Sequence, residues 1–222
     1  MKRHGLGLMN EIQHDSASSQ IEDLVKYFRS NDYTKAIDKA QKILQIIPNN
    51  HFIEKILASS YKKIGKISQA YILFKKIHDS DPNDLEAIFG LANTLLALKS
   101  YDDSIIYYKK VIKLNPDNFE VHNNAGIALL AIQKLEESEL YLRKSIELKF
   151  NHAPAHNNLG LVLCKMSKFK AAEESFLRAI KIDQDYLQGH KNLANLYFLI
   201  GKKKELVESL KKVIELSPED TT

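Results

Sequence analysis

The 222-residue sequence has no tryptophan, one cysteine, 8 glycines and 5 prolines. A single cysteine excludes an internal disulfide, and Cys164 lies among apolar neighbours, which favours a buried small side chain over a nucleophile. No apolar run approaches the roughly 18 residues typical of a membrane-spanning helix, and no apolar stretch follows the basic residues near Met1. These absences predict a cytoplasmic protein in a reducing compartment, with no membrane partner.

The sequence also lacks a strong excess of either positive or negative charge. The chain has 32 lysines and arginines against 28 aspartates and glutamates, a formal net charge of +4, and the two signs are interspersed along the predicted helices. The densest basic groups are short, as at Lys62–Lys63 and Lys202 to Lys204, and are typical of solvated helix surfaces. A nucleic-acid footprint needs a contiguous basic stripe, so we expect no nucleic-acid partner.

The dominant feature of the chain is a spacing of 34 residues. Pro48, Pro82, Pro116 and Pro218 are separated by multiples of 34, and each follows a predicted helix end. The spacing defines six registers without insertion: 17–50, 51–84, 85–118, 119–152, 153–186 and 187–220. In each register two amphipathic helical segments flank a short polar turn, as at Ser167 and Lys168. Two such helices alone cannot cover both apolar stripes, so the copies are expected to stack.

Small and large residues recur at fixed positions when each register is numbered from 1 to 34. Position 8 is mostly small and reads Leu24, Ala58, Ala92, Gly126, Gly160, Ala194. Position 20 reads Ala36, Ala70, Ser104, Ser138, Ala172, Leu206, and position 24 is large in five registers, at Phe74, Tyr108, Leu142, Phe176, Leu210. Small residues let helix axes approach closely, and the large residue then fills the adjoining space.

This pattern resembles the tetratricopeptide repeat (TPR), which has small residues at positions 8 and 20, an aromatic at 24 and proline at 32. The resemblance covers residues 17–220. It implies an all-α fold, a right-handed superhelical α-solenoid of six TPR helix-turn-helix repeats. Residues 1–16 are expected to form a loosely ordered tail, and residues 221–222 the C-terminal end.

The terminal repeats depart from the pattern. Repeat six has Lys203 at the usually apolar position 17 and Leu206 at the small position 20. The sequence predicts no capping helix after it, so its last surface is either soluble or docks on another domain, a partner or a second copy. Self-association through the uncapped C-terminal repeat is therefore one of the open alternatives.

A row of asparagines marks the candidate binding site. At about 100° per residue, position 6 points roughly 200° away from position 8, so we expect it to face a concave groove instead of the stack. The row comprises Asn124, Asn158 and Asn192 at position 6, Asn123, Asn157 and Lys191 at position 5, and Asn93 and Asn195 at position 9. An asparagine amide presents both a donor and an acceptor, which suits a peptide backbone. The alternative is that these amides bridge neighbouring helices within the scaffold.

The position-6 asparagines resemble the ladder on the concave surface of protein O-linked N-acetylglucosamine transferases, although Ile56 and Gly90 interrupt it here. By contrast, the Lys191 and Asn195 pair alone does not assemble the three-repeat clamp with which other TPR domains bind chaperone tails.

Chemistry-bearing motifs are absent: the sequence has no P-loop, CxxC pair or Ser/His/Asp order. His122, His156 and His190 recur 34 residues apart, but neighbouring repeats lie about two interaxial distances of 8–10 Å from each other, too far for one metal ion. We interpret these rings as packed at helix crossings, and expect no metal and no cofactor.

The sequence therefore predicts a non-catalytic scaffold that binds an extended peptide or helix of a protein partner in its groove. A second interpretation is the TPR targeting arm of a glycosyltransferase or sulfotransferase whose catalytic domain is not in this chain. RNA binding of the kind seen in 35-residue helical repeats is disfavoured by the 34-residue period and the near-neutral charge.

Overall fold

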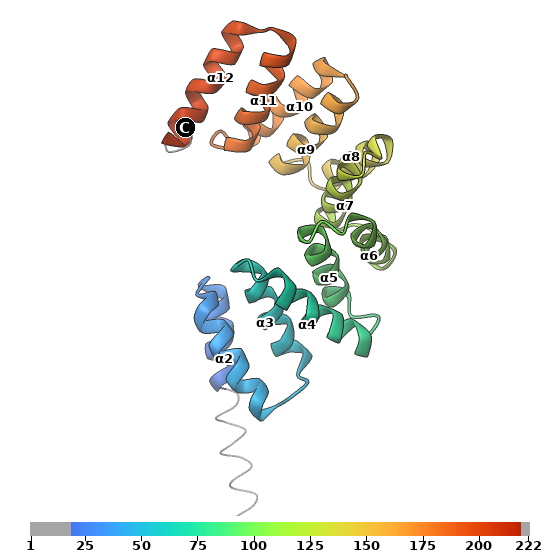
Figure 1. The fold of residues 1–222 in the computed structure, drawn as a ribbon, viewed down its shortest axis with the longest axis vertical. Coiled ribbons are helices and arrows are strands. Elements are labelled where there is room, and N and C mark those ends of the chain that lie inside the picture. The colour runs from blue at the N-terminus through green and yellow to red at the C-terminus, as the bar shows by residue number, and fades with distance from the viewer. Residues whose placement is uncertain (1–18, 219–222) are drawn as a thin grey trace, which may run out of the picture. The chain divides into compact units, whose positions relative to one another are not determined.

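The computed structural model describes residues 19–218, and every regular element of four or more residues in this range is an α-helix (Figure 1). Residues 19–29 are helical. The later helices are α2 (Tyr33–Ile46), α3 (His51–Lys63), α4 (Ile67–Ser80), α5 (Leu85–Ala97), α6 (Tyr101–Leu114), α7 (Phe119–Ala131), α8 (Leu135–Leu148), α9 (Ala153–Lys165), α10 (Phe169–Ile182), α11 (Leu187–Ile200) and α12 (Lys203–Leu216). The expected tail, residues 1–16, and residues 221–222 lie outside the described range.

The helices recur with the period of the sequence. The first helices of repeats two to six, the A helices, begin at His51, Leu85, Phe119, Ala153 and Leu187, the first residues of the registers. The second helices, the B helices, begin at Tyr33, Ile67, Tyr101, Leu135, Phe169 and Lys203. Each A helix thus returns at the same point of the 34-residue period.

The turn between the A and B helices uses the left-handed backbone region in all six repeats. Position 15 has a φ of 62° at Asn31, 79° at Gly65, 61° at Lys99, 61° at Gln133, 59° at Ser167 and 76° at Gly201. Glycine adopts this conformation without steric cost, whereas other residues pay roughly 1–2 kcal/mol. The tight reversal is therefore imposed by helix packing at the four positions that lack glycine.

Position 34 caps the next A helix where it is Asn or Asp. The side chain of Asn50 accepts from the backbone N–H of Ile53 at 3.2 Å, and Asp84 accepts from that of Ala87 at 2.8 Å. Asn118 caps α7 in the same way. Such caps satisfy donors that the first helical turn leaves free.

The predicted fit of small against large residues is confirmed within repeats four and five. A Cβ added to Gly160 would lie 2.5 Å from Phe176 Cε1, and one added to Gly126 would lie 2.6 Å from Leu142 Cγ. Phe176 and Leu142 are both fully buried. Glycine at position 8 therefore lets the A helix rest directly on the large side chain at position 24.

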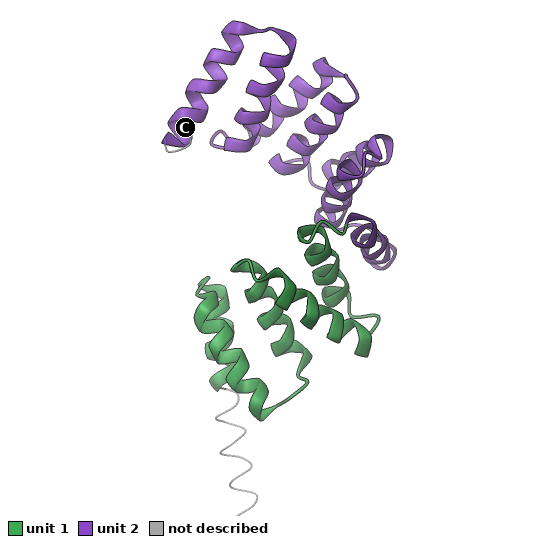
Figure 2. Cartoon of the chain, viewed as in Figure 1, with its two compact units in different colours: residues 1–100 green, residues 101–222 purple. Residues whose placement is uncertain are grey.

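The chain divides into two compact units, Met1–Ser100 and Tyr101–Thr222 (Figure 2). The division falls between α5 and α6, inside the third register of the repeat array expected over 17–220. Unit 1 has a core around Leu24, Ile43 and Ile53, and unit 2 has one around Leu163 and Phe176.

Candidate functional site

The N-terminal halves of three A helices in unit 2 carry adjacent polar residues at positions 5 and 6. These are Asn123 and Asn124 on α7, Asn157 and Asn158 on α9, and Lys191 and Asn192 on α11. Helix α9 packs against both α7 and α11, so the six side chains form one row across unit 2.

Hydrogen bonds between amides join this row from repeat to repeat. Asn158 Nδ2 donates to Asn123 Oδ1 at 2.9 Å, and Asn192 Nδ2 donates to Asn157 Oδ1 at 2.8 Å. In each case position 6 of one repeat meets position 5 of the preceding repeat. Asn123, Asn157 and Asn192 are buried, and the bonds satisfy groups that are costly to bury alone.

The expectation that position 6 points away from the stack is wrong. Besides the amide bonds, Asn124 forms a hydrogen bond with Tyr108, a fully buried residue at position 24 of the preceding repeat. In unit 1 a Cβ on Gly90, also at position 6, would overlap the ring of Phe74, again at position 24 of the preceding repeat. The expectation considered the angle of each side chain around a single A helix and left out the neighbouring repeats. In the structure the preceding repeat covers this side of the A helix as well.

The tyrosine beneath Asn124 is held neutral by its surroundings. Burial raises the pKa of the Tyr108 phenol, and the hydrogen bond with Asn124 offsets only part of that rise. Tyr108 therefore acts as a neutral hydrogen-bonding group that fixes the first amide of the row.

The amides keep some capacity for a ligand. Asn123 uses both ends of its amide, because it donates to Asn124 Oδ1 at 3.0 Å and accepts from Asn158. The acceptor of Asn192 is taken by Gln188 Nε2 at 3.0 Å. Within residues 19–218, no donor reaches Asn158 Oδ1, and this side chain is half-buried. Asn158 thus offers an acceptor that its own donor bond holds in position.

The other predicted site residues are spread more widely. Lys191 is half-buried, and Asn195 is exposed one helical turn further along α11. Asn93 is half-buried in α5 and belongs to unit 1.

Apolar side chains continue the row toward the C-terminal ends of the same helices, and the sequence analysis missed them. They stand four and seven residues after position 5, which places them on the same side of each helix. They are Ile127 and Leu130 on α7, Leu161 and Cys164 on α9, and Phe198 on α11, which is 77% exposed. The sequence does hold a signal for them, because apolar residues recur at positions 9 and 12, outside the stripe that packs each A helix against its neighbours. These residues and the polar row together are called the α7–α9–α11 face.

Cys164 contributes to this face as an apolar group. Burial raises the pKa of its thiol, so the thiolate needed for nucleophilic attack is disfavoured. The interpretation of Cys164 as a small packed side chain fits this environment.

The three periodic histidines hold the loops between repeats. His122 Nε2 lies 2.8 Å from the carbonyl oxygen of Pro116, His156 Nε2 lies 2.9 Å from that of Phe150, and His190 Nε2 lies 2.9 Å from that of Gln184. A carbonyl oxygen only accepts, so Nε2 carries the proton in each ring. All three rings are buried, and the described residues hold no group of three or more side chains placed to bind a metal ion. Each histidine thus links position 4 to position 32 of the preceding repeat.

Burial of His156 and of His152 predicts a loss of stability in mild acid. Burial is the main cause that lowers the pKa of His156, with Arg178 acting in the same direction and the Phe150 carbonyl against it. Burial also lowers the pKa of His152. At these two histidines the unfolded chain therefore binds more protons than the folded chain near the ordinary histidine pKa of about 6.5, so the free energy of unfolding should fall as pH drops below that value.

Urea denaturation between about pH 7.5 and 5.5 measures this effect. The variant His156→Gln keeps a donor for the Phe150 carbonyl but does not titrate, so its stability should depend less steeply on pH. Equal slopes for the variant and the wild type would exclude His156 as a source of the effect.

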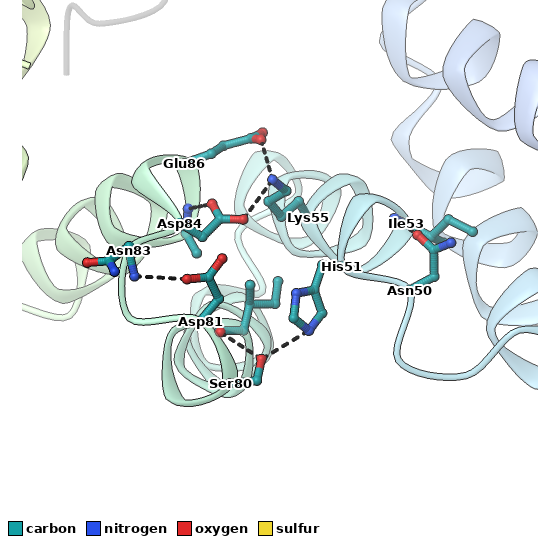
Figure 3. Close-up of polar contacts among 11 residues, drawn as sticks. Asn50, His51, Ile53, Lys55, Ser80, Asp81, Asn83, Asp84 and Glu86 are labelled. Atoms are coloured by element: carbon teal, nitrogen blue, oxygen red, sulfur yellow. Dashed lines mark hydrogen bonds and ion pairs between the residues drawn. The ribbon is translucent and has the colours of Figure 1, made fainter.

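Position 5 has a charged counterpart in unit 1 (Figure 3). Lys55 Nζ lies 3.0 Å from Asp84 Oδ2 and 3.0 Å from Glu86 Oε2, at the start of α5. Burial opposes the charge of Lys55, but hydrogen bonds to the two carboxylates outweigh it and raise its pKa. Burial likewise opposes ionisation of Asp84, yet its bonds to the Ala87 backbone and Lys55 lower its pKa. In both units, position 5 therefore joins one A helix to the next.

Comparison with protein families identifies the repeat. One tetratricopeptide repeat model matches residues 153–186, a TPR repeat model matches 92–133, and a further tetratricopeptide repeat model matches 119–152 and 191–220. These matches cover more than half of the chain, which belongs to the tetratricopeptide repeat family. Repeats of this family generally mediate protein–protein interactions, and the fold is typical of non-catalytic scaffolds.

Solved structures share the fold. MamA from Desulfovibrio magneticus RS-1 is 18% identical, with a TM-score of 0.70 over 78% of this chain and 97% of that one. TTC0263, a thermophilic TPR protein of Thermus thermophilus, is 23% identical, with a TM-score of 0.68 over 77% of this chain and 93% of that one. A chain of the APC/C hetero-tetramer Cut9–Hcn1 is 20% identical, with a TM-score of 0.77 over 89% of this chain and 39% of that one. The predicted fold class, an all-α solenoid of TPR repeats, is confirmed.

A comparison with curated protein sequences finds no match. Among the described helices, none combines the length and apolar character that crossing a membrane requires.

Proposed function

We propose that this TPR protein is a non-catalytic scaffold that binds an extended segment or a helix of a partner protein on the α7–α9–α11 face. The observation that carries the proposal is the combination on one face of a preordered amide row and an exposed aromatic anchor. Asn158 supplies the free acceptor, and Phe198 is 77% exposed.

The two parts of the face suit different parts of a partner. A backbone N–H of the bound segment donates to Asn158 Oδ1, a bond that contributes about 0.5–1.5 kcal/mol. Because Asn158 is already tied to Asn123, little side-chain freedom is lost on binding. Covering the Phe198 ring adds about 1.5–3 kcal/mol, so apolar contact supplies the larger share of the affinity. Asn124, Lys191 and Asn195 complete the proposed contacts, and Asn93 would contribute a separate contact in unit 1. Asn192, which is buried between Asn157 and Gln188, orders the row.

Electrostatics favours a protein partner over nucleic acid. Lys168 pairs with Glu139 at 3.0 Å, and Lys202 pairs with Glu173 at 2.8 Å. Such pairing neutralises lysines that a phosphate backbone would need. The single cysteine further supports a reducing compartment, the cytoplasm, as the site of action.

Selection from a random peptide library displayed on phage tests this proposal over many candidate partner sequences at once. Selected peptides are then titrated against the wild type, Phe198→Ser and Leu199→Ser. Leu199 is 63% exposed and adjacent in sequence, but its side chain turns about 100° away from the face, so it is a matched control. Phe198→Ser should weaken binding about tenfold or more, and Leu199→Ser should leave it unchanged. Equal losses in both variants would overturn the proposal.

A further inference from the structure

A groove of about 490 Å³ lies between the B helices α10 and α12, and the A helix α11 forms its floor. The floor residues Leu193 and Tyr197 stand two residues after positions 5 and 9, which belong to the α7–α9–α11 face, so they turn about 200° away from that face. One wall is Leu177 of α10, an apolar side chain that is 46% exposed. This second concave surface of unit 2 is called the α10–α12 groove.

The wall from α12 carries two carboxylates without a cation. Glu205 and Glu208 line the groove, are exposed and form no ion pair within residues 19–218. Burial and a hydrogen bond to a third glutamate raise the pKa of the Tyr197 phenol to about 12, and the charges of Glu205 and Glu208 add to this rise. Lys204 and Lys211 stand within one turn of Glu208 but pair with neither carboxylate. The two carboxylates therefore face the floor of the groove with their charge unpaired.

The other lysines around the groove are already engaged. Lys202 Nζ lies 2.8 Å from both carboxylate oxygens of Glu173, the glutamate that also accepts from the Tyr197 hydroxyl. Lys212 Nζ lies 2.9 Å from Glu215 Oε1, near the C-terminal end of α12. Neither lysine is thus free to neutralise the carboxylates in the N-terminal half of α12.

The equivalent groove one repeat earlier contains its own cations. This groove of about 420 Å³ lies between α8 and α10 and is lined by two arginines and two glutamates. In the α10–α12 groove, Leu177 stands at the position of the first of these arginines, Arg143, and Glu205 stands at the position of Ala171. The later groove has therefore lost a cation and gained a carboxylate, which favours a positively charged ligand.

A buried hydroxyl lies beside the two carboxylates. Ser209 lines the groove and is 7% exposed, and its hydroxyl forms no hydrogen bond within residues 19–218. The equivalent serine of repeat five, Ser175, donates to the carbonyl oxygen of Ala171 at 2.8 Å. Because buried polar groups are generally hydrogen-bonded, the Ser209 hydroxyl is available to a group that enters the groove.

We infer that the α10–α12 groove binds an arginine side chain of a partner protein together with an apolar side chain beside it. A guanidinium presents planar N–H donors that match two carboxylates and the oxygen of Ser209. Its hydrocarbon stem and the apolar neighbour cover Leu177 and Tyr197. The inference does not depend on the proposed function, because the variants below spare Asn158 and Phe198.

A synthetic peptide with one arginine between two leucines and blocked termini serves as the probe. It is titrated against the full chain by NMR, beside a peptide in which citrulline, a neutral group of nearly the same shape, replaces the arginine. The arginine peptide should bind at least about fivefold more tightly, should shift the amide signals of Tyr197 and Ser209, and should bind more weakly at higher salt. Equal affinities for the two peptides would overturn the inference.

Two matched double variants locate the binding. Glu205→Gln, Glu208→Gln should weaken the arginine peptide about fivefold or more, with helicity by circular dichroism unchanged. The control is Glu137→Gln, Glu174→Gln, which removes two exposed glutamates at the same repeat positions, 19 and 22, and changes the net charge equally. The control should leave binding unchanged. Equal losses in both would mean general attraction to negative charge and would overturn the inference.

A third variant fills the groove from within. Leu177→Arg gives repeat five the arginine that repeat four has at position 25, Arg143. The new guanidinium should occupy the carboxylates and weaken the arginine peptide about fivefold or more. Unchanged affinity would overturn the inference. So would a concentration-dependent dimer that Glu205→Gln, Glu208→Gln abolishes and the peptide fails to displace, because the groove would then receive a second copy.

Discussion

Replacing Phe176 with alanine is expected to lower the free energy of unfolding by about 3–5 kcal/mol. The ring is fully buried in the core of unit 2, and α9 rests on it through Gly160. Its removal leaves a cavity that the rigid helix backbones cannot close. Urea denaturation followed by circular dichroism measures the change.

A second substitution shows whether the fit between Gly160 and Phe176 is the cause. Gly160→Ala in the wild type places a Cβ 2.5 Å from Phe176 Cε1, and overpacking of about 1–3 kcal/mol then exceeds or cancels the gain in helix propensity of about 1 kcal/mol. In the Phe176→Ala background the same Cβ enters free space and should stabilise the chain. If Gly160→Ala has the same effect in both backgrounds, the two residues are not coupled in this way.

Replacing Lys76 with methionine is expected to destabilise unit 1 by about 3 kcal/mol, the lower end of the range for breaking a buried ion pair. Lys76 Nζ lies 2.5 Å from Glu54 Oε1, and the Glu54 side chain is only 3% exposed. Without Lys76 the carboxylate stays buried without a cation, and its second oxygen already has no hydrogen-bond partner within residues 19–218. We expect the lower end of the range of destabilisation because about half of the Lys76 side chain is exposed to solvent.

The double variant Glu54→Met, Lys76→Met separates this cause from lost packing. With both charges gone no buried carboxylate remains, so the stability should return to within about 1 kcal/mol of the wild type or exceed it. A double variant at least as unstable as Lys76→Met would show that the lysine acts through its hydrocarbon stem instead.

The repeat architecture could be predicted from the sequence because it depends on spacing and steric volume. The A helices begin at the register boundaries, and Gly160 meets Phe176 as small against large. Both features follow from a helix that must bury one stripe and from residues that limit how closely two helices approach.

The candidate site was only partly predictable, because its geometry depends on neighbouring repeats. The asparagines at positions 5 and 6 do lie in one row, but their bonding from Asn158 to Asn123 requires the preceding A helix, which a single helical wheel omits. Similarly, the residue types at Lys99 and Gln133 do not predict a left-handed backbone, because packing of the flanking helices imposes it. The apolar continuation to Phe198 was missed because position 12 was assigned no role and position 9 was considered only where it is asparagine.

Hydrogen–deuterium exchange of the chain, alone and with a peptide selected from the random library, tests the central proposal most directly. Binding on the α7–α9–α11 face should slow exchange in α7, α9 and α11, and this protection should be lost in Phe198→Ser and kept in Leu199→Ser. Protection confined to the B helices α8 and α10, or unchanged by Phe198→Ser, would contradict the assignment of the binding function to this face.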